Sequence, residues 1–138
     1  MTEQKAVTTI KPIDEVRMSL TKMEPQFKVA LPPQISPEKF IRVIMTALGQ
    51  NPELASANRQ SLYAAAMKAA QDGLLCDGRE AALVMFGSDV AYLPMVNGIL
   101  KKVRNSGELA SITSQVVHKN DTFRFWIDSN GENLNHEP

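Results

Sequence analysis

The residues of this chain best suited to chemistry are polar and basic side chains on a short predicted helix, residues 95–105. At about 100° per residue, Asn97, Lys101 and Arg104 fall within roughly 60° of one another, so one face presents an amide and two cations. Lys102, on another side of the helix, is a third cation. Cations held on a packed helix can meet successive phosphates of a single nucleic-acid strand. The same spacing is also typical of the solvated face of an ordinary amphipathic helix.

These cations are useful only if the helix is anchored. Its apolar residues form a stripe next to the cationic face: Val96, Ile99, Leu100 and Val103. We expect this stripe to pack on a sheet and to hold the cations in place.

A second candidate site lies in the segment 122–126. On a strand, Arg124 and Trp126 share one face, whereas Phe123 and Phe125 share the other. An arginine beside an aromatic ring on an exposed face suits the stacking of unpaired bases. Alternatively, the two phenylalanines face the core and the tryptophan covers a sheet edge.

Two further cations stand near predicted turns. Arg79 follows a helix and precedes a strand, where loop side chains often face a ligand, but the adjacent Glu80 offers it an ion-pair partner instead. Lys119 belongs to the same basic stretch as the short helix. Residues 95–126 contain five basic and two acidic side chains, although the whole chain is neutral with fifteen of each.

No group of residues predicts catalysis. Cys76 has no neighbouring cysteine or histidine and is expected to be a packed thiol. His118 and His136 lack the spacing of metal ligands. The sequence contains no Walker-type glycine loop, Ser-His-Asp order or paired-carboxylate signature. We therefore expect no catalytic residue, no metal site and no cofactor, and a protein that is not an enzyme.

The elements that carry these residues predict an α+β fold with antiparallel hairpins packed with helices. Helices are expected from Ser36-Pro37 to Gly49 and from about Ser61 to Gln71, with Gly73 as the cap of the second. The hairpins are expected at 82–94, turning at Gly87-Ser88, and at 112–127, turning at Asn120-Asp121. The order is helix-helix-hairpin-helix-hairpin.

The N-terminal part is expected to differ from the rest. Residues 1–35 predict a flexible or weakly helical segment, in which Pro25 ends a weak helix and Pro32-Pro33 imposes an extended linker. With a single cysteine, no apolar signal-peptide core and no run of about 20 apolar residues, we expect a cytoplasmic protein without a membrane anchor.

Several motifs together resemble the RecT family of phage single-strand DNA annealing proteins. They are Ser36-Pro37, Asn51-Pro52-Glu53-Leu54, Ala70-Gln71-Asp72-Gly73-Leu74, Asp77 to Leu83, and Gly98 to Gly107. In the last of these, the residues that keep the family pattern are Gly98, Arg104, Ser106 and Gly107. Val96, Asn97 and Asn105 stand where family members usually have an aromatic and two basic residues.

This resemblance implies binding of single-stranded DNA and ATP-independent annealing to a complementary strand in phage-type homologous recombination. It further implies a homo-oligomeric ring or filament and a phage exonuclease partner. No protein site for magnesium is identified in the sequence, so we expect this ion only as a counterion of the DNA. Residues 36–138 would form the RecT-like core, which stops short of the family's C-terminal region. The DNA-binding residues would be those named above: Arg79, Asn97, Lys101, Lys102, Arg104, Lys119, Arg124 and Trp126.

An alternative from another class is an interaction or self-assembly fragment without useful DNA affinity. The neutral charge and the acidic residues of segment 127–138, Asp128, Glu132 and Glu137, favour it. Salt-dependent binding to a single-stranded oligonucleotide separates the two hypotheses.

Overall fold

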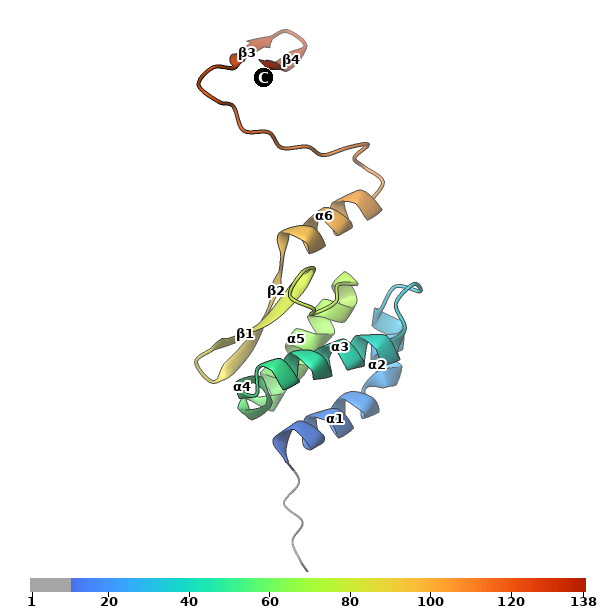
Figure 1. Ribbon diagram of the computed structural model, residues 1–138. Helices are drawn as coiled ribbons and strands as arrows, with labels where there is room; N and C mark the ends of the chain where they lie inside the picture. Colours follow the sequence, from blue (N-terminus) through green and yellow to red (C-terminus); the bar gives the residue numbers. More distant parts are fainter. Residues whose placement is uncertain (1–10) are drawn as a thin grey trace, which may run out of the picture. The chain divides into compact units, whose positions relative to one another are not determined.

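The computed structural model of the chain describes residues 11–138, which form two units that meet in sequence at Glu108 and Leu109 (Figure 1). Between residues 11 and 108, the first unit contains six helices and one hairpin: α1 (Pro12–Lys22), α2 (Glu24–Ala30), α3 (Pro37–Gln50), α4 (Glu53–Ser56), α5 (Arg59–Asp72), β1 (Ala81–Phe86), β2 (Asp89–Pro94) and α6 (Val96–Asn105). The second unit contains one hairpin, β3 (Thr122–Asp128) and β4 (Gly131–Glu137). Both hairpins are antiparallel, which confirms the predicted α+β class.

The N-terminal helices are part of the packed first unit. Val16 and Leu20 of α1 and Phe27 of α2 are completely buried in the same apolar cluster as Phe40 of α3. The rings of Phe27 and Phe40 lie 5.2 Å apart between centroids. The structure thus differs from the expected flexible or weakly helical segment over residues 12–30, whereas residues 1–10 of that segment lie outside the described part.

The first helix ends at Lys22, shortly before Pro25, as the sequence predicted, but a second helix follows at once and holds Pro25 in its first turn. Proline lacks an amide proton, and the first helical turn is the place where that proton has no partner. The proline therefore separates α1 from α2 instead of ending the helical region.

The helix signals of the central sequence are largely confirmed. Ser36 caps α3 by accepting a hydrogen bond from the backbone N–H of Lys39 at 3.3 Å, and Pro37 begins the helix. Gly73 ends α5 with a φ of 66°, the left-handed conformation that glycine adopts without strain. Gly49 was expected to end α3, but the helix continues through it to Gln50.

The first hairpin turns at Gly87-Ser88, as predicted, and packs its inner face on α5 (Figure 1). Ala81, Leu83 and Val90 are the buried members of this face. The backbone N–H of Val90 donates to the Ser61 hydroxyl at 2.9 Å. Strand pairing and this bond hold β1 at a defined position beside α5.

In the second hairpin, the strand Thr122–Asp128 pairs with a different segment from the one that the sequence predicted. Residues 112–118 are not a strand, and Thr122–Asp128 pairs instead with Gly131–Glu137. Asp128 accepts a hydrogen bond from the backbone N–H of Asn130 at 2.8 Å, and Gly131 has a φ of 118°. The two-residue turn Ser129-Asn130 therefore closes the hairpin, because a tight local turn brings its neighbouring segments together most readily.

Within residues 11–138, no helix combines the length and the apolar composition that crossing a lipid bilayer requires.

Candidate nucleic-acid interface

The short basic helix is attached to the first unit through a glycine. Gly98 of α6 is buried, and a Cβ added there would lie 2.0 Å from the backbone oxygen of Glu80 and 2.8 Å from Cδ1 of Leu74. The backbone N–H of Met95 donates to the same Glu80 oxygen at 2.9 Å. The backbone of α6 thus sits directly on the connection between α5 and β1.

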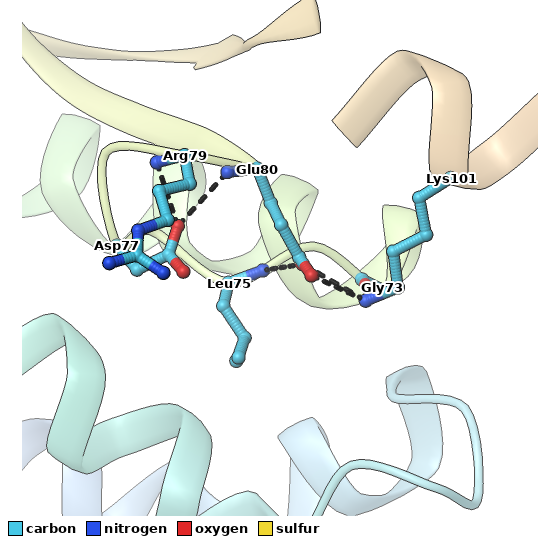
Figure 2. A network of polar contacts seen from close by, with 6 residues as sticks. All are labelled: Gly73, Leu75, Asp77, Arg79, Glu80 and Lys101. Carbon is cyan, nitrogen blue, oxygen red and sulfur yellow. Dashed lines mark hydrogen bonds and ion pairs between the residues drawn. The ribbon is translucent and has the colours of Figure 1, made fainter. Parts of the chain in front are cut away.

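Lys101 strengthens this attachment with an ion pair. Its ammonium group lies 2.9 Å from Oε1 and 3.0 Å from Oε2 of Glu80, and it also donates to the backbone oxygen of Gly73 at 3.5 Å. Figure 2 shows the carboxylate of Glu80 between Lys101 and the backbone N–H of Leu75, which donates to it at 3.0 Å. Glu80 therefore connects α6 to the segment that follows α5.

The adjoining turn is fixed by Asp77. Its Oδ1 accepts hydrogen bonds from the backbone N–H groups of Arg79 and Glu80, at 2.9 and 3.0 Å (Figure 2). The side chain of Arg79 is exposed, and the partner of Glu80 is Lys101. The alternative ion pair between Arg79 and Glu80 is thus absent from the described residues.

Lys102 makes a second ion pair, with Asp72 at the end of α5. The two atoms, Nζ and Oδ1, lie 2.5 Å apart. The other oxygen of Asp72 accepts a hydrogen bond from the Tyr92 hydroxyl at 2.9 Å. The bond from Lys102 is the main cause that lowers the pKa of Asp72, whereas burial, followed by the bond to Asp72, raises the pKa of Tyr92.

The predicted anchoring face of α6 is wrong. Val96 is 72% exposed and Ile99 is 49% exposed, and the other two residues of the apolar stripe are only half-buried, so the stripe is not the face that packs most closely. Gly98, Lys101 and Lys102 face the first unit instead. The reason is that a glycine allows backbone-to-backbone contact, and two carboxylates lie within reach of the lysines.

The candidate residues of α6 therefore divide into two groups. Lys101 is half-buried and paired, and Lys102 is exposed but also paired, whereas Asn97 and Arg104 are exposed. Among residues 11–138, Arg104 has no ion-pair partner. The single face predicted for Asn97, Lys101 and Arg104 is thus divided between an attached and an open part.

A cleft of about 430 Å³ runs beside α6 in the first unit. Lys101, Lys102, Asn105 and Ser106 line it from α6, and Gly73 lines it from the end of α5. Its other wall is the segment between α2 and α3, including Leu31 and Ile35. The cleft thus combines an apolar wall with cationic and hydrogen-bonding groups.

The second unit carries the remaining candidates. Arg124 and Trp126 share a face of β3, and Cζ of Arg124 lies 5.1 Å from the centroid of the Trp126 ring. Lys119 is exposed in the turn before β3. Phe123 and Phe125 are exposed on the other face, so neither face of this hairpin is a buried core within the second unit.

A histidine connects β4 to the segment before β3. Nε2 of His136 lies 2.9 Å from Oδ2 of Asp121, and Nδ1 lies 3.2 Å from Oε1 of Gln115. The backbone N–H of His118 also donates to Asp121, which is the main cause that lowers the pKa of this carboxyl, and His136 adds to it. This arrangement fastens the segment to the hairpin. Within residues 11–138, no group of three or more histidine, cysteine or acidic side chains is placed to hold a metal ion.

The single cysteine is placed for packing. Cys76 is buried, and burial, followed by the negative charge of Asp77, raises the pKa of its thiol to about 12. A thiol with so high a pKa is largely protonated at neutral pH and is a poor nucleophile.

The comparison with protein families decides the membership of this chain. The model of the RecT family matches residues 38–138. The chain belongs to the RecT family. It is 29% identical over 126 residues to Protein RecT of Escherichia coli (strain K12), a match that covers 84% of this chain and 46% of that relative. The chain spans less than half of the length of this curated relative, and no solved structure matches it.

The motifs of the RecT resemblance occupy the part of the first unit that holds α6. The segment Ala70–Leu74 ends α5, Asp77–Leu83 begins β1, and Gly98 provides the close contact between them and α6. Sequence reasoning missed Asp72 and Glu80 as partners of the two lysines. The sequence does place these two acidic residues eight positions apart and two adjacent lysines after them. This pattern does not show which lysine pairs with which carboxylate.

Proposed function

We propose that this chain binds single-stranded DNA and promotes its annealing to a complementary strand in homologous recombination, without hydrolysis of ATP. The match of residues 38–138 to the RecT family is the observation that carries this proposal. The exposed arginine on an anchored helix supports it, since a fixed cation can bind a phosphate with little loss of side-chain entropy.

The cations of the first unit have different roles in this proposal. Arg104 and Lys102 contact phosphates, and Arg79 adds a cation from the turn before β1. Lys102 is 48% exposed and can exchange Asp72 for a phosphate, because both are anionic oxygen acceptors. Lys101 is a positioning residue, since its ammonium group is already bonded to Glu80 and to the end of α5.

Annealing requires that the bases remain accessible. Contacts to phosphates leave the Watson–Crick edges free and reduce the repulsion between two strands. The proposed binding therefore shows little sequence preference and weakens with salt, with a slope of about −0.7 per phosphate contact on a logarithmic scale.

The proposed partners are a single strand, its complement and further copies of this chain in a ring or filament. A phage exonuclease that supplies the single strand is a further proposed partner. Magnesium enters only as a counterion of the DNA, and the proposed setting is the cytoplasm.

The test is fluorescence anisotropy of a labelled single-stranded oligonucleotide at two salt concentrations, followed by addition of its complement or of an unrelated strand. Arg104→Ala is expected to weaken binding about fivefold, equivalent to roughly 1 kcal/mol, and to reduce the salt slope by about 0.7. Arg42→Ala is the matched control, because Arg42 is also an exposed helical arginine but lies on α3. It is expected to bind like the unchanged chain.

Lys101 needs a variant that separates binding from folding. Lys101→Ala leaves the carboxylate of Glu80 without its cation, whereas Glu80→Gln with Lys101→Met removes both charges. If Lys101 positions α6, the double variant binds DNA better than Lys101→Ala. Absence of oligonucleotide binding at low salt would refute the proposed function and favour an interaction or self-assembly fragment.

A further inference from the structure

The second hairpin has two chemically different faces, which follow from its register. Opposite residues of an antiparallel pair project from the same face, and Arg124 pairs with Asn135 while Trp126 pairs with Asn133. We call these four residues the Arg–Trp face. It presents a guanidinium group, an indole and two amides.

The other face is mostly apolar and suits a different kind of contact. Phe123, Phe125 and Ile127 lie on it opposite His136, Leu134 and Glu132. It contains no arginine or lysine, and the histidine is already bonded to Asp121. Exposed carbon surface without cations or amides is better suited to protein packing than to a phosphate-bearing ligand.

On the Arg–Trp face, the indole is both held and accessible. The guanidinium carbon of Arg124 lies 5.1 Å from its centroid, a distance typical of a cation–π contact, yet Trp126 is 37% exposed. Asn133 and Asn135 each use an amide hydrogen within their own segment, toward Gly131 and Glu137. Each amide keeps a second donor hydrogen and its oxygen for a ligand.

The charges of this face show which part of a nucleic acid it favours. Asp128 and Glu137 lie at its two ends and oppose the single charge of Arg124. The face therefore has no net attraction for a chain of phosphates. An accessible indole, in contrast, stacks on any unpaired base.

We propose that the Arg–Trp face binds an unpaired base of single-stranded nucleic acid by stacking it on Trp126, while Asn133 and Asn135 bond to the adjoining sugar oxygens. This inference rests on the proposed function and adds the site at which bases, and not phosphates, are held. Stacking occupies the flat face of a base and leaves its Watson–Crick edge free for the complement. Paired bases are not ligands, because their faces are already stacked within the duplex.

The test uses the fact that Trp126 is the only tryptophan of the chain, so its fluorescence reports on this face directly. The full chain is titrated with a thymidine oligonucleotide, with an abasic strand of equal length and with a duplex, while anisotropy of labelled strands measures binding separately. We expect the oligonucleotide to quench the tryptophan emission and the abasic strand and the duplex to leave it nearly unchanged.

Variants add a second readout. Trp126→Ala is expected to weaken oligonucleotide binding about tenfold with an unchanged salt slope, whereas Trp126→Phe retains most of the affinity. Ile127→Ala, on the other face, is the matched control and is expected to bind normally. Arg104→Ala changes the salt slope and so distinguishes phosphate binding in the first unit from stacking in the second.

Two results would overturn the inference while the proposed function stands: oligonucleotide binding by anisotropy without a change in tryptophan emission, or equal quenching by the abasic strand. If no strand binds at any salt concentration, the proposed function itself fails and the stacking site fails with it.

Discussion

At the residue scale, Gly98 determines whether α6 can remain on the first unit. The position is helical, where alanine is normally preferred to glycine by about 1 kcal/mol. The nearest atom to an added methyl group, however, is the backbone oxygen of Glu80, which cannot rotate away as a side chain can. At this residue, helix propensity therefore favours alanine, whereas the close contact with the Glu80 backbone requires glycine.

We predict that Gly98→Ala lowers the free energy of unfolding by about 1–3 kcal/mol or detaches α6, because the added methyl group has no space. Denaturant unfolding measures the first effect. Hydrogen exchange of the Met95 amide, which donates to Glu80, measures the second. Gly49→Ala is the control, since nothing lies within 4 Å of its added Cβ, and it should not destabilise. Equal stability and exchange in Gly98→Ala and the unchanged chain would contradict the proposed contact.

The carboxyl group of Asp72 makes the attachment of α6 dependent on pH. Because its pKa is lowered in the folded state, its contribution to stability is fully present above the unfolded value of about 3.9 and is lost as the pH falls through the lower folded value. Asp72→Asn should therefore be less stable than the unchanged chain at pH 7, by about 1 kcal/mol or less for a partly exposed pair. The difference should shrink toward pH 2.5. Urea unfolding across this range measures it, and a difference independent of pH would contradict this reading of the ion pair.

At the element scale, α5 is the helix on which the first hairpin packs, and its small side chains allow the close approach. Ala65, Ala66, Ala69 and Ala70 are buried on it, whereas Ala64 is exposed. A helix with a face of alanines can lie nearer to its neighbours than one with longer side chains. The position of β1, and hence of Glu80, depends on this distance.

We predict that Ala69→Leu destabilises the first unit by about 1–3 kcal/mol, because the site has no room for three further carbon atoms. Ala64→Leu makes the same chemical change on the exposed side of α5 and should alter stability by less than about 0.5 kcal/mol. Thermal or urea unfolding compares the two variants. Similar stabilities would show that the alanine face of α5 is not tightly packed.

At the scale of the whole molecule, the chain consists of two units with very different cores. The first contains the buried apolar cluster, whereas the second is a single hairpin with exposed apolar side chains. An isolated two-stranded hairpin is marginally stable in water. The contact between the side chains of His136 and Asp121 adds a tertiary interaction to the second hairpin.

We predict that limited proteolysis with elastase first cuts residues 109–117, which are exposed and without regular structure. Ala110, Val116 and Val117 are suitable sites for this protease. The N-terminal product should unfold at nearly the same temperature as the intact chain, because it keeps the buried cluster. Initial cleavage within α3 or α5 would contradict this division.

The sequence alone determined those features that depend only on residues close together in the chain. The cap at Ser36, the left-handed end of α5 at Gly73 and the turn at Gly87-Ser88 each need only local backbone geometry, and each was predicted correctly. The RecT membership was likewise readable from motifs that stand close together in the chain.

Only the tertiary structure decided which groups meet across the fold. The attached face of α6, the pairing of Lys101 with Glu80 and the strand partner of Thr122–Asp128 depend on contacts between separate segments. Helical periodicity predicted that α6 packs through its apolar stripe. The helix packs instead through the side that holds Gly98 and the two lysines, because the glycine allows close backbone contact and two carboxylates pair with the lysines. Periodicity shows which residues share a face of a helix. Which face is buried depends on the free energy of the contacts that each face can make with the rest of the fold.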